Sequence, residues 1–218
     1  MLISLKYEFL FVHIAKTGGT SVRAALAPLL WRDPLRWLQY ACNRVSGLTG
    51  HKLGVKLPRH AKAVAALEML PGDVFRSLYK FAFVRNPWDL QVSSYHHIQR
   101  ERPHLLAGIT SFDDFLAWKL EGERAYHYIL DASTEPQWDS LIDLRGRCIV
   151  DFIGRYERLA DDYQQACQNI GLPKIPALPH RRQTDRRRDY RRYYTDRSAE
   201  LIAKHFAADI ERFGYQFD

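Results

Sequence analysis

A chain of 218 residues is long enough for one large domain with a hydrophobic core, and we expect a single domain over residues 1–218. No run approaches the ~20 apolar residues of a membrane span, the start of the chain lacks a signal-peptide pattern, and the three cysteines form no CxxC pair, so a disulfide scaffold and a zinc site are not indicated. Because the sequence shows neither a membrane span nor a signal peptide, we expect a cytoplasmic protein. The net charge is +7, much of it in one short segment, which indicates a local site for an anionic ligand, and we expect no nucleic acid as partner.

The first informative stretch is 8–26, EFLFVHIAKTGGTSVRAAL, which predicts a strand, a glycine turn and a helix in that order. Residues 10–14 are rich in apolar β-formers, as is typical of an interior strand of an α/β sheet. The paired glycines allow positive φ, and one of the two hydroxyl residues behind them can cap the helix. Unpaired amides in that first turn, together with a lysine, favour a bound phosphate or sulfate. The candidate anion loop comprises Lys16, Thr17, Gly18, Gly19, Thr20 and Ser21.

The position of the lysine argues against a nucleotide-phosphate loop of the Walker type, in which the lysine follows the last glycine. Here Lys16 precedes both glycines. The order FVHIAKTGGTS instead resembles the 5′-phosphosulfate loop of the sulfotransferases that use 3′-phosphoadenosine 5′-phosphosulfate (PAPS). The simpler alternative is a glycine turn with a solvated lysine.

Residues 28–60 carry candidates for the acceptor side of a site. The amphipathic segment 28–45 interleaves tryptophans with arginines and either packs against the core, lines a substrate groove or lies on a membrane surface, so peripheral membrane contact stays open. His51 falls in a predicted loop. His60 directly precedes a predicted helix at 61–70, where a loop side chain can face a ligand.

The second informative stretch is KFAFVRNPWDLQVSSYHH, residues 80–97. It predicts a buried strand at 81–84 and a helix that begins near Pro87. Arg85 would project from the carboxyl end of the strand, where open α/β sheets bind ligands, and Ser93 follows about two helical turns later. The segment resembles the 3′-phosphate-binding segment of PAPS-dependent sulfotransferases, in which the arginine and the serine hold that phosphate.

The later elements follow from caps and periodicity. They are a capped amphipathic helix at 111–120, a third strand at 147–154, a helix at 158–170 that ends at Gly171, and a last helix at 196–213 that ends at Gly214. The VDFIGRYERL pattern at the third strand also resembles the sulfotransferases.

Segment 181–192 concentrates positive charge, with seven arginines and two aspartates. Guanidinium groups suit phosphate or sulfate oxygens, although a solvated basic loop would have the same composition. The segment resembles the basic loop that closes over the nucleotide in carbohydrate-type sulfotransferases. Where those enzymes show Asn-x-Ser/Thr, this chain has Arg182-Gln183-Thr184, and Arg182 and Thr184 are the matching candidates. A binding module for nucleic acid or acidic polysaccharide remains an alternative.

The resemblance extends over nearly the whole chain and implies a fold and a reaction. The fold would be α/β, with a central parallel sheet flanked by helices as in the P-loop nucleotide kinases. The reaction would move a sulfuryl group from PAPS to an acceptor hydroxyl or amine, most like the enzymes that act on carbohydrates. The alternative enzyme is an ATP-dependent kinase with a divergent phosphate loop.

The same resemblance suggests roles for single residues. Lys16 would stabilise charge on the departing phosphate, and no metal is expected, because the sequence shows no second carboxylate signature for magnesium. The acceptor needs a base, for which histidine is suited near neutral pH. His60 is the first choice because RHAKA resembles the family's His-Ala-x-Ala element, and His51 is the second.

Overall fold

The computed structural model describes residues 1–31, 33, 37, 41–42, 44–45, 48, 57–179 and 189–218. Two compact units interleave along the chain. Unit 1 takes its residues from 1–14, 18–84 and 140–181, and unit 2 takes its residues from 15–17, 85–139 and 182–218. The chain therefore passes between the units at the candidate anion loop and again directly after the strand that precedes Arg85.

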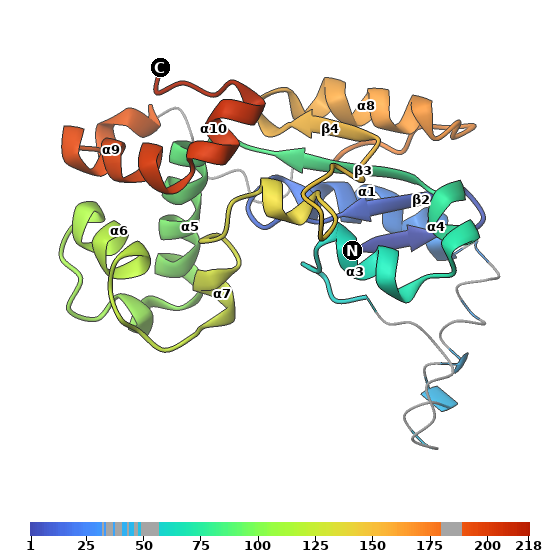
Figure 1. Cartoon of the computed structure of the whole chain (residues 1–218), viewed down its shortest axis with the longest axis horizontal. Helices are drawn as coiled ribbons and strands as arrows, with labels where there is room; N and C mark the ends of the chain where they lie inside the picture. Colours follow the sequence, from blue (N-terminus) through green and yellow to red (C-terminus); the bar gives the residue numbers. More distant parts are fainter. Residues whose placement is uncertain are drawn as a thin grey trace. The chain divides into compact units, whose positions relative to one another are not determined.

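Unit 1 is built on a four-stranded sheet in the order β1-β2-β3-β4 (Figure 1). The strands are β1 (Leu2–Ser4), β2 (Phe9–Val12), β3 (Tyr79–Val84) and β4 (Phe152–Arg155). The last three run parallel, and β1 pairs antiparallel with β2. The mostly parallel α/β sheet agrees with the prediction, whereas β1 was not predicted because three residues are too short to show a pattern.

Aromatic side chains hold the sheet in register. Phe11 lies opposite Phe81, and Phe81 lies opposite Phe152. The rings of Phe11 and Phe81 stack with their centroids 5.1 Å apart. Because side chains alternate across a strand, these rings share one face with Phe9 and Phe83, and burying that face stabilises the sheet.

Two helices pack on this phenylalanine face. They are α1 (Gly19–Trp31) and α8 (Leu159–Asn169), whose buried residues belong to the same core as the rings. Further helices of unit 1 are α3 (Ala63–Met69), α4 (Gly72–Ser77) and the short 3₁₀ turn η3 (Tyr156–Arg158). Helix α3 lies within the predicted range 61–70, and α8 stops just before Gly171, which takes a φ of 73° as a helix terminator should.

The third strand is shorter than the predicted 147–154. Strand β4 begins only at Phe152, because the residue before it pairs differently. Asp151 donates its amide to the Lys80 carbonyl (2.8 Å) and accepts the Lys80 amide with its carboxylate (2.7 Å). Cys148 instead forms an isolated bridge with Ile142.

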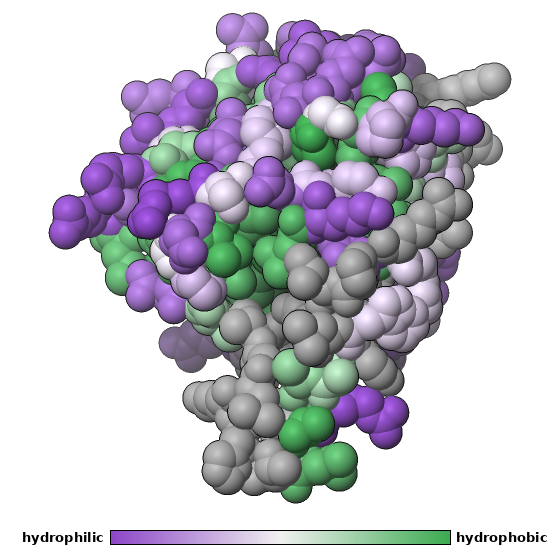
Figure 2. Space-filling view, turned by 90° about the vertical axis from the view of Figure 1, so that its right-hand side faces the viewer, coloured by the Kyte–Doolittle hydropathy of each residue, from purple (hydrophilic) through white to green (hydrophobic). Residues whose placement is uncertain are grey.

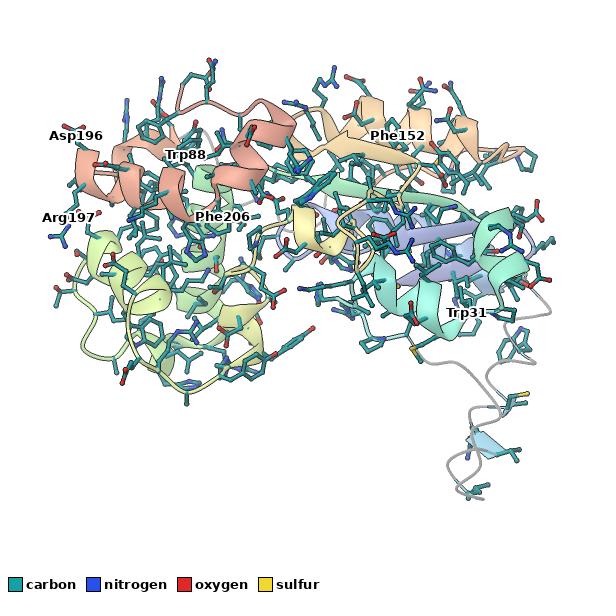
Figure 3. All side chains as sticks on the ribbon, viewed as in Figure 1. Trp31, Trp88, Phe152, Asp196, Arg197 and Phe206 are labelled. Atoms are coloured by element: carbon teal, nitrogen blue, oxygen red, sulfur yellow. The ribbon has the colours of Figure 1, made fainter. Side chains whose placement is uncertain are left out.

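Unit 2 is helical. Among its described residues, the helices are α5 (Pro87–Glu101), α6 (Phe112–Leu120), α7 (Tyr128–Asp131), α9 (Asp196–His205) and α10 (Ala207–Phe213), with 3₁₀ turns η1 (Pro103–Leu106) and η4 (Tyr190–Tyr193) and the boundary turn η2 (Trp138–Ser140). Helix α5 starts at Pro87 as predicted, and Asn86 caps it by accepting the Trp88 amide (3.0 Å). The Trp88 indole donates to the Ala199 carbonyl (2.9 Å), which joins α5 to α9 (Figure 3).

The predicted single helix at 196–213 is two helices. The break lies at Phe206, at the junction of α9 and α10 (Figure 3), where the backbone leaves helical geometry with φ −105° and ψ 27°. Phe206 is buried there, and so is Asp209 one turn later. Hydrophobic periodicity alone does not reveal this bend, because both halves of the segment keep the same spacing of apolar residues.

The surface is mixed in character. The face drawn in Figure 2 is largely hydrophilic, with apolar side chains visible between the polar ones. Within the described residues, no helix has both the length and the apolar character needed to cross a membrane.

Candidate functional site

The anion loop has the predicted turn with two corrections. Only Gly18 of the two glycines has a positive φ (82°), and Lys16 also takes the left-handed conformation with φ 66°. Helix α1 begins at Gly19, so Thr20 and Ser21 lie in its first turn and not at its cap. A non-glycine residue with φ near 66° is strained by about 1–3 kcal/mol and tends to occur at functional positions.

Gly19 is needed for space and not for its φ. A Cβ built on Gly19 would lie 2.1 Å from Cδ2 and 2.3 Å from Nε2 of the His13 ring. His13 is buried directly after β2, and its ring stacks on Phe11 with centroids 5.6 Å apart. The imidazole therefore supports the start of α1 from within unit 1.

Part of the first turn's donor set is already used. The Gly18 carbonyl accepts the amides of Ser21 (2.9 Å) and Val22 (3.3 Å). For the amides of Gly19 and Thr20, no partner occurs among the residues that the structure describes. These two amides are the N–H groups that α1 can present to an anion. They are fewer donors than the six-residue candidate anion loop contains.

Lys16 and Arg85 come together in unit 2. Arg85 is 1 % exposed and donates from Nη1 to the Lys16 carbonyl (2.8 Å). Its Nε and Nη2 donate to one oxygen of Asp89, at 2.8 and 2.6 Å. The guanidinium at the end of β3 thus binds the backbone of the lysine while Asp89, in the first turn of α5, balances its charge.

Gln137 is a site residue that sequence reasoning missed. Its side-chain oxygen accepts the Arg85 amide (2.9 Å), and its side-chain nitrogen donates to the Arg85 carbonyl (2.8 Å). Asp209 on α10 in turn accepts from the Gln137 amide (2.8 Å). A glutamine in a loop has no periodicity or motif, so no local signal could have identified it.

His60 and His13 lie next to each other in unit 1, with His13 buried and His60 partly buried. Their ring centroids are 4.5 Å apart, and His60 Nδ1 donates to the His13 carbonyl (2.9 Å), which leaves Nε2 as the basic nitrogen of the neutral ring. Burial lowers the pKa of His60, and burial together with the charge of His60 lowers the pKa of His13 to about 2. Both rings are therefore neutral near pH 7, the form that a general base requires.

Of the remaining predicted site residues, the structure describes Ser93. Ser93 lies on α5 and is 9 % exposed. His51, Arg182 and Thr184 lie outside the described residues. No group of three metal-binding side chains occurs within the described part of the chain.

Comparison with known proteins gives two relatives and a family. The chain is 34 % identical over 102 residues to an uncharacterized protein of Archaeoglobus fulgidus, which covers 46 % of this chain and 74 % of the relative. It is 22 % identical over 209 residues to mouse (Mus musculus) carbohydrate sulfotransferase 14, covering 83 % of this chain and 49 % of that protein, so the match spans about half of the mouse relative's length. No solved structure matches the chain. A model described as the sulfotransferase family matches residues 1–216, and the chain therefore belongs to the sulfotransferase family.

Proposed function

We propose that this protein transfers a sulfuryl group from PAPS to a hydroxyl or amine of a carbohydrate acceptor. The observation that carries the proposal is the start of α1, where the amides of Gly19 and Thr20 lack partners among the described residues and follow, in the chain, a strained Lys16. Family membership supports a transferase, and the mouse relative, named as a carbohydrate sulfotransferase, supports the acceptor class. We also propose a single domain over 1–218 with the sheet of a nucleotide kinase.

The loop suits the charge that develops in sulfuryl transfer. When bound, PAPS supplies the sulfuryl group and leaves as adenosine 3′,5′-bisphosphate. Lys16 and the two amides would hold the 5′-phosphosulfate, and the positive charge would stabilise the bridging oxygen more in the transition state than in the ground state. Gly19 lets the start of α1 lie against the His13 ring, because any side chain there would meet that ring.

The end of β3 suits the other phosphate of the donor. Arg85 and Ser93 would bind the 3′-phosphate, as the sequence resemblance implies. Asp89 fixes the fork of Arg85, so the guanidinium is oriented before a ligand arrives. Arg182 and Thr184 stay predictions for the closing loop.

His60 would act as the base toward the acceptor. Its Nδ1–H is fixed on the His13 carbonyl, so Nε2 is the atom that would take the proton of the acceptor hydroxyl as its oxygen attacks sulfur. His51 stays the second candidate for this role.

The test is a transfer assay with sulfur-labelled PAPS and a panel of carbohydrate acceptors. Lys16→Ala is expected to reduce turnover by at least about 100-fold, because a donor aimed at developing charge is typically worth that much. Lys174→Ala is the matched control, since Lys174 is exposed in unit 1 and is expected to keep wild-type turnover. Equal activity of Lys16→Ala and wild type, or no transfer to any acceptor by the wild type, would contradict the proposal.

A second test concerns the paired N–H donors of the Arg85 guanidinium. Arg85→Lys keeps the charge but loses the paired N–H donors. We therefore expect the binding free energy of adenosine 3′,5′-bisphosphate to become less favourable by about 1.5–3 kcal/mol. Titration calorimetry measures it. Unchanged affinity would remove Arg85 from the 3′-phosphate site.

A further inference from the structure

Gln137 replaces a neighbouring strand for one residue of the chain. Directly after β3, its side-chain amide bonds both main-chain polar groups of Arg85, at 2.9 Å to the amide and 2.8 Å to the carbonyl. Gln137 is 2 % exposed, so water does not compete for these groups. This pairing fixes the backbone of Arg85 and hence the direction in which its side chain leaves.

Asp209 fixes the orientation of that amide. One carboxylate oxygen accepts the main-chain amide of Gln137 (2.8 Å) and its side-chain nitrogen (3.2 Å), and the other accepts the Trp138 amide (2.8 Å). Because the carboxylate accepts from the side-chain nitrogen, the side-chain oxygen must face the Arg85 amide. Asp209 is fully buried on α10, the helix created by the break at Phe206.

A further hydrogen bond connects Arg85 to the anion loop. Nη1 of Arg85 donates to the carbonyl of Lys16, the residue held at φ 66°. Such a backbone conformation persists only where surrounding contacts hold it, and the hydrogen bond from Arg85 is one of these contacts. Asp209, Gln137, Arg85 and Lys16 thus form one connected set within unit 2.

We propose that Gln137 is a positioning residue that sets Arg85 and, through it, the Lys16 turn for binding the nucleotide donor. The inference rests on the proposed function, because the ligand is the adenosine bisphosphate of that reaction. Gln137 touches no substrate in this scheme. It acts on affinity and on turnover through Arg85.

The experiment measures the dissociation constant for adenosine 3′,5′-bisphosphate by calorimetry, with steady-state kinetics on the full chain. Gln137→Met keeps the volume and loses both bonds to Arg85, so the affinity is expected to fall about tenfold, kcat to fall, and the acceptor KM to change less than about twofold. Asp209→Asn is the milder second variant and is expected to change the same quantities in the same direction. Melting temperatures confirm that each variant is folded.

Gln91→Met is the matched control for burial. Gln91 is likewise fully buried in unit 2, and it binds the Ser133 carbonyl (2.9 Å) and Lys119 Nζ (2.6 Å) without bonding Arg85. It is expected to lose stability without losing nucleotide affinity. In an Arg85→Lys background, Gln137→Met is expected to add less than about twofold to the dissociation constant, because its effect passes through Arg85.

The outcomes separate the two proposals. If the wild type does not bind adenosine 3′,5′-bisphosphate, the proposed function fails. If the wild type binds it and Gln137→Met matches Gln91→Met, or the effects of Gln137→Met and Arg85→Lys simply add, the positioning role alone is overturned.

Discussion

Gly19 and His13 are matched in size, and this match shapes the anion loop. The imidazole occupies the volume that any Cβ at Gly19 would need, so the start of α1 can rest on the ring only if residue 19 is glycine. Burial also lowers the pKa of His13 to about 2. The ring is therefore neutral near pH 7 and adds no positive charge beside the loop.

We expect Gly19→Ala to destabilise the protein, because its Cβ would overlap the His13 ring by more than 1 Å. The double variant Gly19→Ala with His13→Ala is expected to recover part of the loss, with a coupling energy of about 1 kcal/mol or more. Urea unfolding of both singles and the double measures it. Gly72→Ala is the control, since its Cβ would meet only the end of the Arg76 side chain, and purely additive effects of Gly19→Ala and His13→Ala would refute the match.

The protonation of His60 sets the pH range of the proposed reaction. Because burial lowers the pKa of His60 below 6.5, the base stays neutral as the pH falls to 6.5, and kcat/KM is expected to decline only at lower pH. His60→Ala is expected to lower kcat by about 10²–10⁴-fold and to abolish that limb of the profile. His104→Ala, at an exposed position, is the control. A limb centred above pH 6.5 would contradict the assignment.

At the scale of elements, unit 2 depends on helix caps that also make tertiary contacts. Ser111 caps α6 in a capping box with Asp114, and Thr195 caps α9 in a similar box with Ser198. Thr195 Oγ1 in addition donates to Asp113 of α6 (2.7 Å), so one hydroxyl serves both helices.

Thr195→Ala is therefore expected to cost more than a cap alone. An N-cap typically contributes about 1 kcal/mol, and the lost bond to a carboxylate adds to it, so we expect a decrease of about 2 kcal/mol in the free energy of unfolding. Thr195→Ser keeps the hydroxyl and should retain most of the stability. Chemical denaturation compares the two, and equal losses in both variants would show that the hydroxyl contributes nothing.

At the scale of the whole molecule, the choice of ligand distinguishes a sulfotransferase from a kinase. Adenosine 3′,5′-bisphosphate at about 100 times its dissociation constant should stabilise the folded chain by about 2.7 kcal/mol, a shift of about 5–10 °C in melting temperature. ATP with magnesium is expected to give a smaller shift. Stabilisation by ATP with magnesium alone would favour the kinase alternative.

The family motifs and the elements around them could be predicted from the sequence. The strand before the anion loop, the helix that begins at Pro87 and the cap at Ser111 are encoded by neighbouring residues, and the structure has them in place. The predicted bounds of the third strand and the predicted single helix at 196–213 were wrong. The start of β4 depends on Lys80, which is far away in the chain, and the bend at Phe206 leaves the spacing of apolar residues unchanged. The roles assigned to Lys16, Arg85 and His60 stay predictions.

By itself, the sequence determined the local elements, the α/β class and the position of an anion loop, because propensity, capping and hydrophobic period act over a few residues. Only the tertiary structure decided that Gln137 holds Arg85 across 52 residues, that Asp209 holds Gln137 across 72, and that His13 fills the space beside Gly19. These contacts form between side chains that no local pattern relates, since folding brings them together only when the separate elements pack and bury their polar groups.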